Sequence, residues 1–235
     1  MAHQPFAGRR VAVTGASGSL GQALLQELHR QGASVVALTS SDGAGTAIPA
    51  EQVPWRCGEE EALRPLLAGC NVLVINHGYN SHADRSSTAV ERSLEINALS
   101  SWRLMELFAA LAAGDGPDQP RRELWMNTSE AEIQAAVSPL YEISKRLQGQ
   151  LFSLRSLDLA GPRLRLRRLV LGPFRSALNP IGVMSPEFVA REILRQVSWN
   201  CGLVIVTPNP LTYLLMPLAS LSRWFYFRAT TRSTN

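Results

Sequence analysis

Residues 14–21, TGASGSLG, decide the fold, because they join a short apolar run to a helical pattern. The run before them, residues 10–14 (RVAVT), has the composition of a buried strand. Residues 20–31 follow with apolar side chains at helical spacing. The stretch therefore predicts a strand–turn–helix unit whose turn is built from three glycines.

The three glycines have separate predicted roles. Gly15 permits a tight turn, Gly18 lets the backbone approach a pyrophosphate, and Gly21 allows the helix to pack closely on the strand. A helix N-terminus presents free N–H groups and the positive end of a dipole to phosphates. We therefore expect a dinucleotide-phosphate site here, formed by Gly15, Ser17, Gly18, Ser19, Leu20 and Gly21.

Apolar runs and helical patterns alternate through the rest of the chain. This alternation predicts an α/β fold with a doubly wound parallel seven-stranded sheet and helices on both faces. The chain of 235 residues is expected to be one domain, with a core at 9–206 and an apolar tail at 207–235. The expected strands are 10–14, 34–38, 52–55, 71–76, 123–128, 163–171 and 203–206, and the expected helices are 20–31, 59–67, 88–113, 140–159 and 186–197.

The composition excludes several classes of protein. Apolar residues make up 46% and charged residues 18%, which is an ordinary globular balance. A net charge of +4 without a long basic run gives no prediction of nucleic-acid binding. Three widely spaced cysteines and four scattered histidines predict neither a disulfide framework nor a metal site. With no apolar leader at the N-terminus, we expect a cytoplasmic protein.

Tyr141 and Lys145 lie four residues apart in a helical pattern and therefore share one helix face. A phenol has an unperturbed pKa of about 10, so it is a poor acid–base catalyst at neutral pH. An ammonium group one turn away favours the phenolate and lowers that pKa. The pair is thus a candidate for proton transfer.

Five features stand in a characteristic order along the chain. They are the glycine loop, Asn76-His77-Gly78 after the fourth strand, Ser129 after the fifth, and the Tyr141 and Lys145 pair. In this order they resemble the short-chain dehydrogenase/reductase family, and the resemblance covers about residues 9–206. It implies a three-layer Rossmann fold and an NAD(P)-dependent oxidoreductase.

The resemblance implies a role for each catalytic candidate. Tyr141 would be the acid or base at the carbonyl or alcohol oxygen, and Lys145 would lower its pKa and bind the nicotinamide ribose. Ser129 would polarise the substrate carbonyl. Asn97 would hold a proton-relay water. The cofactor would also lie against Asn76, His77, Gly78, Gly172 and Pro173.

The second strand bears on which nicotinamide nucleotide binds. It ends in Thr39 and Ser40, which are neutral, whereas an acid there would repel a 2′-phosphate. NADP(H) is therefore favoured, with NAD(H) as the alternative, and Asp42 could still turn inward.

The pattern leaves alternatives open. Ser129 stands twelve residues before Tyr141, where thirteen is commoner in the family, so Glu130 could occupy the expected place. His77 could hydrogen-bond the cofactor or merely fill space. The leading hypothesis is a carbonyl reductase or alcohol dehydrogenase. A non-catalytic NAD(P)-binding regulatory or scaffold protein is one alternative, and an epimerase or dehydratase, indicated by the glycine spacing, is another.

The apolar tail and two loops bear on partners. Residues 211–227, LTYLLMPLASLSRWFYF, could pack on the sheet or in a subunit interface, form an interfacial membrane anchor, or line a substrate portal. The segments 130–139 and 174–184 are expected to contact a small carbonyl or alcohol substrate of lipophilic character. The family resemblance further implies a homodimer or homotetramer packed through the helices at 88–113 and 140–159.

Overall fold

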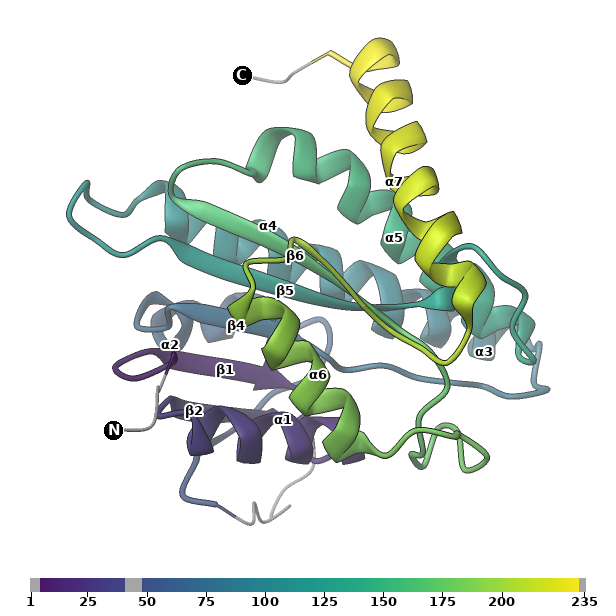
Figure 1. Ribbon diagram of the computed structural model, residues 1–235, viewed down its shortest axis with the longest axis horizontal. Coiled ribbons are helices and arrows are strands. Elements are labelled where there is room, and N and C mark those ends of the chain that lie inside the picture. The colour runs from purple at the N-terminus through teal and green to yellow at the C-terminus, as the bar shows by residue number, and fades with distance from the viewer. Residues whose placement is uncertain (1–4, 41–47, 233–235) are drawn as a thin grey trace.

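A computed structural model describes residues 5–40 and 48–232 and shows one seven-stranded sheet. All strands are parallel, and their order is β3-β2-β1-β4-β5-β6-β7 (Figure 1). The sheet reverses its winding between β1 and β4, which is the place where doubly wound folds bind their ligands, just beyond the carboxyl ends of the strands. The predicted fold class is confirmed.

The strands fall where the apolar runs predicted them. They are β1 (Arg10–Thr14), β2 (Ser34–Thr39), β3 (Glu51–Pro54), β4 (Val72–Ile75), β5 (Arg122–Ser129), β6 (Leu164–Leu171) and β7 (Leu203–Val206). The helical segments are α1 (Ser19–Arg30), η1 (Glu60–Leu63), α2 (Arg64–Ala68), α3 (Ser87–Leu94), η2 (Glu95–Leu99), α4 (Ser100–Ala113), η3 (Glu130–Glu132), α5 (Pro139–Leu159), α6 (Pro186–Ser198) and α7 (Pro210–Thr230).

Helices cover both faces of the sheet. α1 and α6 pack on one face, where Val11 and Val13 of β1 join Leu24 and Ile193 in one core. α4 and α5 pack on the other face, together with Ala12 of the same strand. Neighbouring residues of β1 thus enter opposite cores, which explains why the strand is apolar throughout rather than alternating.

Two predicted helices differ from the observed ones. The helix expected at 88–113 is interrupted by η2, a π-helical turn at Glu95–Leu99. The helix expected at 59–67 divides into the 3-10 turn η1 and the short α2. A π-helical turn inserts an extra residue per turn, which the 3.6-residue apolar period does not reveal. Both interruptions lie inside segments whose position along the chain was predicted.

The apolar tail forms α7, and Pro217 lies inside this helix without ending it. Met216 packs on Val170 of β6 and Ile205 of β7, so α7 covers the sheet edge. α7 also packs on α5, a helix for which the family resemblance implied a subunit interface. Among the helices of residues 5–40 and 48–232, none is long and apolar enough to cross a membrane.

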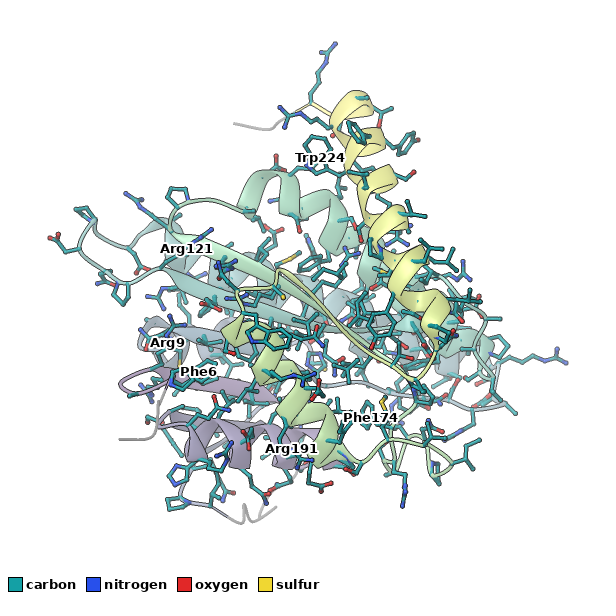
Figure 2. All side chains as sticks on the ribbon, viewed as in Figure 1. Phe6, Arg9, Arg121, Phe174, Arg191 and Trp224 are labelled. Carbon is teal, nitrogen blue, oxygen red and sulfur yellow. The ribbon has the colours of Figure 1, made fainter. Side chains whose placement is uncertain are left out.

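The amino edge of the sheet carries paired charges. Glu123, at the start of β5, accepts hydrogen bonds from Arg9 at 3.0 Å and from Arg167 at 2.8 Å. Burial, the largest single influence, raises the pKa of this carboxyl, but Arg167, Trp125 and Arg9 together outweigh it and lower the pKa to about 2. Figure 2 shows Arg9 at this edge and Phe174 at the opposite one. The amino edge is therefore held together by ion pairs.

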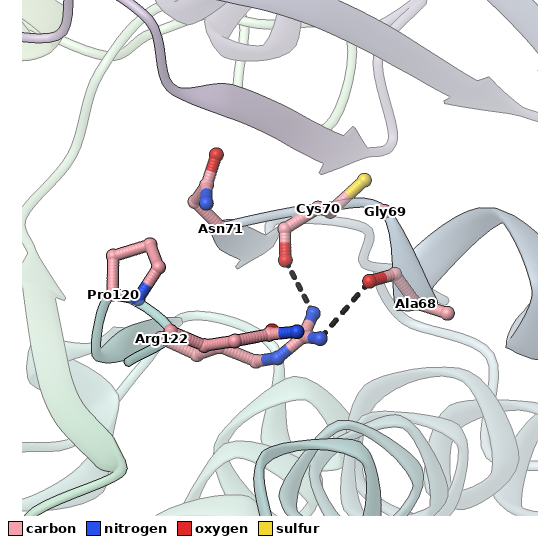
Figure 3. Close-up of a pocket in the computed structure, with 7 residues that line it drawn as sticks. Ala68, Gly69, Cys70, Asn71, Pro120 and Arg122 are labelled. Carbon is pink, nitrogen blue, oxygen red and sulfur yellow. Dashed lines mark hydrogen bonds between the residues drawn. The ribbon is translucent and has the colours of Figure 1, made fainter. Parts of the chain in front are cut away.

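Arg122 fills a small hollow at the same edge, between the starts of β4 and β5 (Figure 3). Its guanidinium donates to the carbonyl oxygens of Leu67, Ala68 and Cys70 and pairs with Asp115 at 2.6 Å. The hollow of about 140 Å³ is too small for a dinucleotide, and its arginine is already satisfied. It is a structural feature, remote from the carboxyl edge.

Candidate active site at the carboxyl edge

The glycine loop after β1 has the geometry of a phosphate cradle. Gly15 has a φ of +61°, and a Cβ there would lie 2.8 Å from the Cα of His77. A Cβ on Gly21 would lie 2.2 Å from the carbonyl oxygen of Gly15. Only glycine fits either position, since the loop, the end of β4 and α1 approach one another so closely.

The N-terminus of α1 is open beside this loop. Gly18 is its N-cap and supplies no side-chain hydrogen bond, so the first N–H groups of the helix stay free for a ligand. Ser17, Gly18 and Ser19 are exposed, whereas Leu20 and Gly21 are buried. This arrangement fits the phosphates of a dinucleotide, with the exposed residues facing solvent and the buried ones fixing the turn.

Thr14 joins the ends of β1 and β4. Its hydroxyl accepts hydrogen bonds from the backbone N–H of Asn76 at 2.8 Å and of His77 at 3.2 Å. The same hydroxyl lies 2.8 Å from Nδ1 of His77. The sequence prediction missed Thr14, although its position as the last residue of a buried strand, just before a glycine turn, was visible.

His77 is a buried, neutral imidazole. It contacts Trp55 edge-to-face, with ring centroids 5.2 Å apart. Burial lowers the pKa of His77 to about 4, and the nearby charge of Lys145 acts in the same direction. The ring bonds to Thr14 through Nδ1, and its Nε2 is buried without a hydrogen-bond partner, so both roles considered for His77 stay predictions.

A polar chain runs from the glycine loop to Lys145. The Asn76 amide lies 3.5 Å from the Gly15 carbonyl, and its Oδ1 accepts from Asn127 at 2.8 Å. The carbonyl of Asn127 in turn accepts from Lys145 Nζ at 3.2 Å. Asn127 was missed by the sequence prediction, yet it links the cradle to Lys145.

Lys145 is buried, and within the described chain it forms no salt bridge. Its Nζ donates to Asn127 and, at 3.0 Å, to Oε1 of Gln148. Burial lowers the pKa of Lys145 to about 8, and Glu132 only partly opposes this. A cation held in this way is poised near neutral pH, as groups that act in catalysis commonly are.

Tyr141 differs from the prediction in its pKa. Lys145 Nζ lies 5.8 Å from the centre of the phenol ring, yet the pKa of the hydroxyl is raised overall. Burial is the largest cause and raises this pKa, Ser129 acts to lower it, and the charge of Glu130 raises it further. The expected net lowering of the Tyr141 pKa is therefore wrong, because desolvation dominates.

Ser129 and Glu130 are distinguished by their partners. Ser129 ends β5 and lies near the phenol of Tyr141, and its hydroxyl accepts from the N–H of Ala131 at 3.2 Å. The carboxylate of Glu130 accepts from Thr207 at 2.7 Å and Thr212 at 3.1 Å. Two threonine hydroxyls therefore hold Glu130 toward the start of α7, leaving Ser129 as the hydroxyl beside Tyr141.

Asn97 lies in the π-helical turn η2 and is fully buried. Its side chain accepts from Tyr79 N at 2.7 Å and donates to Tyr79 O and to Ser144 Oγ, both at 2.8 Å. The Ser144 hydroxyl donates to the carbonyl of Tyr141 at 2.9 Å. Asn97 thus ties the loop after β4 to α5. Its predicted role in holding a water stays a prediction.

The remaining predicted cofactor residues lie at the ends of neighbouring strands. Gly78 follows His77, and a Cβ on it would lie 3.4 Å from Oδ1 of Asn97. Gly172 precedes Pro173 at the end of β6 and lies tightly against Thr207. At the end of β2, Thr39 is buried and Ser40 exposed. Asp42, the residue that could turn inward, lies outside the described residues.

A buried charge cluster beside the site also went unpredicted. Glu132, fully buried, pairs with Arg168 of β6 at 3.5 Å and with Arg223 of α7 at 2.9 Å. Arg168 donates to the Gly149 carbonyl at 3.1 Å. Sequence position alone gave no signal for this cluster, because its members are 36 and 91 residues apart from Glu132.

Sheet order, glycine cradle and the Ser129, Tyr141 and Lys145 group define a short-chain dehydrogenase/reductase. The sequence model of the NAD dependent epimerase/dehydratase family matches residues 11–131. The chain belongs to this family, which is a branch of the same superfamily. Nicotinamide-nucleotide binding therefore accompanies the fold.

Two curated proteins are similar to this chain in sequence. A monoglucosyldiacylglycerol epimerase of Synechocystis sp. is 45% identical over 233 residues, which is 97% of this chain and 56% of that protein. A dTDP-4-dehydrorhamnose reductase of Mycolicibacterium smegmatis is 31% identical over 106 residues, covering 45% of this chain and 28% of that protein. The chain thus spans about half, or less, of the length of these curated relatives.

Solved structures share the fold. A short chain dehydrogenase from Burkholderia cenocepacia in complex with NADP superposes with a TM-score of 0.78 at 18% identity, covering 96% of this chain and 99% of that one. A ketone-specific alcohol dehydrogenase from Comamonas testosteroni gives 0.76 at 15% identity, covering 97% and 96%. At such low identity these likenesses show the fold alone.

Proposed function

We propose that the chain carries an NAD(P)-dependent epimerase activity that inverts one hydroxyl-bearing carbon of a hexosyl headgroup on a glycolipid. The single observation that carries this proposal is the 45% identity to the Synechocystis epimerase. That likeness extends over 97% of this chain, so it spans the glycine loop, the Tyr141 and Lys145 pair and α7 alike. No reductase relative matches over a comparable length among the two curated proteins described above.

The residues at the carboxyl edge fit a nicotinamide dinucleotide. The glycine cradle and the open N-terminus of α1 would hold its phosphates, and Lys145 would reach the nicotinamide ribose. Such a cofactor, when bound, accepts and returns a hydride at the carbon that bears the reacting oxygen. Thr39 and Ser40 put no charge at the end of β2, which favours NADP(H) over NAD(H).

The chain's own residues would move the proton. Tyr141 exchanges one proton with the reacting oxygen, and Ser129 donates a hydrogen bond to that oxygen. Lys145, while cationic, stabilises the phenolate that forms when Tyr141 gives up its proton. Loss of a hydride and a proton, followed by their return on the other face of the carbon, converts the substrate into its isomer. No net oxidant or reductant is needed.

Carbonyl reduction is the second candidate, and one observation favours it. Burial raises the pKa of Tyr141, which keeps its phenol protonated at neutral pH. A protonated phenol is the form that donates a proton to a carbonyl oxygen. Epimerisation and carbonyl reduction would use the same residues of the site. They differ in whether the nicotinamide nucleotide is consumed.

The test is a conversion assay on a defined glycolipid. Purified protein with NADP(H) or NAD(H) is incubated with monoglucosyldiacylglycerol in detergent micelles, and the released headgroup sugar is analysed. We expect a second hexose to appear, and to be lost in the Tyr141→Phe variant, whereas Ser198→Ala, which removes an exposed hydroxyl at the end of α6, leaves it unchanged. Recovery of glucose alone with every nucleotide would contradict the proposal.

A further inference from the structure

α7 has a strip of apolar side chains on its solvent-facing side. Leu211, Leu214, Leu218, Leu221 and Phe225 recur at helical spacing along one side of the helix, and each is at least 54% exposed. Residues three or four apart on a helix share a face, and these five follow one another at intervals of three and four, so their side chains form one continuous strip. A strip of large exposed apolar side chains on a water-facing helix marks a surface that is covered in use.

The opposite side of α7 is fixed to the body of the protein. Thr212 and Met216 are buried, and Arg223 pairs with the fully buried Glu132 at 2.9 Å. Gln134 donates to Thr212 at 2.7 Å and accepts from Asn209 at 2.6 Å. The inner side of α7 is thus packed on the protein. The outer strip is therefore exposed in the folded chain and is not the side by which α7 packs on the sheet.

The chemistry of the strip points to lipid. α7 contains two arginines and no acid, and its last turns hold Trp224, Phe225, Tyr226 and Phe227. Arg228 lies over the Trp224 ring at 5.3 Å, and Figure 2 shows Trp224 far from the sheet. Aromatic rings beside arginines suit the headgroup level of a bilayer with anionic lipid.

We propose that α7 lies flat in the interface of an anionic lipid bilayer, with its apolar strip among the acyl chains and Arg228 at the headgroups. The helix is not apolar enough to cross a membrane, so it would lie along the surface. The proposal stands on the geometry of α7 and does not rest on the epimerase function.

A second copy of the chain fits this strip less well. A symmetric dimer through α7 would bring two apolar strips together and place Arg228 of each copy beside the other helix. Since α7 has no acid, the helix itself offers that arginine no partner. Anionic headgroups supply the missing negative charge.

The position of α7 would bring a membrane to the site. α7 starts just after β7, at the carboxyl edge, where its Thr212 contacts Glu130 next to Ser129. The loops 133–138 and 174–184 lie toward the same end of the molecule as this start (Figure 1), and they expose Val137 and Ile181. A bilayer under α7 would therefore lie near the carboxyl edge, where a lipid-linked headgroup would react.

Vesicle flotation tests the proposal. The protein is mixed with vesicles of phosphatidylcholine alone or with added phosphatidylglycerol. We expect it to float with the anionic vesicles, and the triple variant Leu214→Gln, Leu218→Gln, Leu221→Gln to lose at least about tenfold in partitioning. Arg228→Gln should lose about fivefold on anionic vesicles only. The unfolding temperature of each variant must match that of the parent.

Matched variants on another face serve as controls. Phe188→Gln with Trp199→Gln removes two exposed apolar side chains, one from α6 and one from the residue that caps its end, and Arg191→Gln removes an exposed arginine from α6. Neither should change flotation. Retained flotation of the folded triple variant would overturn the proposal. So would a protein that ignores vesicles and sediments as a dimer which the triple variant dissociates. Because flotation does not read turnover, its outcome is independent of the epimerase assay.

Discussion

The two edges of the same sheet handle buried charge in opposite ways. At the amino edge, Glu123 lies between Arg9 and Arg167, and Arg122 is paired with Asp115. At the carboxyl edge, Lys145 is buried on neutral partners, and His77 is held uncharged. A buried charge without a counter-ion costs stability, whereas a paired one does so far less.

The amino edge therefore supports the fold, whereas the carboxyl edge is the candidate ligand site. Each amino-edge charge is satisfied within the fold and gains nothing from a ligand. The carboxyl edge brings together a lysine of lowered pKa, a tyrosine of raised pKa and an open helix N-terminus. Perturbed groups gathered at the ends of parallel strands are what a ligand site needs. Substitutions at the two edges should therefore affect different measurements.

The largest expected effect is on turnover, at the carboxyl edge. Tyr141→Phe removes the exchangeable proton, so turnover should fall about 10³-fold while NADPH binding, followed by fluorescence, stays within twofold or so of the parent. Ser198→Ala, which removes an exposed hydroxyl at the end of α6, is the control. Undiminished turnover in Tyr141→Phe would remove the tyrosine from the mechanism.

The next largest effect is on stability, at the amino edge. Glu123→Gln leaves Arg167 and Arg9 without their carboxylate, and should lower the free energy of unfolding by about 2–3 kcal/mol with no change in cofactor affinity. Because the pKa of Glu123 is lowered to about 2, its contribution is complete above the ordinary carboxyl pKa and is lost as the pH falls toward 2.

Chemical denaturation at several pH values measures this contribution. The difference between parent and Glu123→Gln should shrink steadily in acid. Glu61→Gln, in an exposed pair with Arg64, is the control and should leave stability unchanged. A pH-independent difference would mean that Glu123 acts through packing rather than charge.

A smaller effect is expected on cofactor affinity. Gly21→Ala places a Cβ 2.2 Å from the Gly15 carbonyl, so the cradle must open, and NADPH affinity should fall about tenfold. Gly116→Ala is the control, because nothing lies within 4 Å of a Cβ there. Equal NADPH affinity in both folded variants would show that the nucleotide binds elsewhere.

The smallest effect is that of pH on turnover. With the pKa of Lys145 lowered to about 8, turnover at pH 8 should be about half that at pH 7, and it should continue to fall as the lysine becomes neutral. Lys145→Arg keeps the charge, so any remaining activity should lose this alkaline decline. A decline of the same shape in Lys145→Arg would assign it to another group.

Much of the fold could be predicted from the sequence, because parallel strands and amphipathic helices leave periodic apolar patterns. The same holds for the glycine cradle, whose three positions depend on local backbone geometry. Thr14 was visible as the last residue of a buried strand, but Asn127 and Glu132 could not be found in this way. The role of Glu132 comes from contacts across 36 and 91 residues of sequence, and that of Asn127 from the meeting of strand ends; neither leaves a local pattern.

The pKa of Tyr141 shows a second limit. Spacing along a helix correctly placed Lys145 one turn from the phenol, with Nζ 5.8 Å from the ring centre. It could not show how strongly the surrounding protein excludes water from the hydroxyl. Desolvation depends on every neighbour at once, so the sign of the shift emerged only from the three-dimensional packing.

The proposed isomerisation at the carboxyl edge uses a retained nicotinamide nucleotide. It is tested most directly by counting product hexose formed per nucleotide supplied, with the nucleotide's reduced fraction followed in the same sample. We expect many headgroups to be converted per nucleotide, with no net change in that fraction. One reduced nucleotide consumed for each product molecule would contradict it and establish a reductase instead.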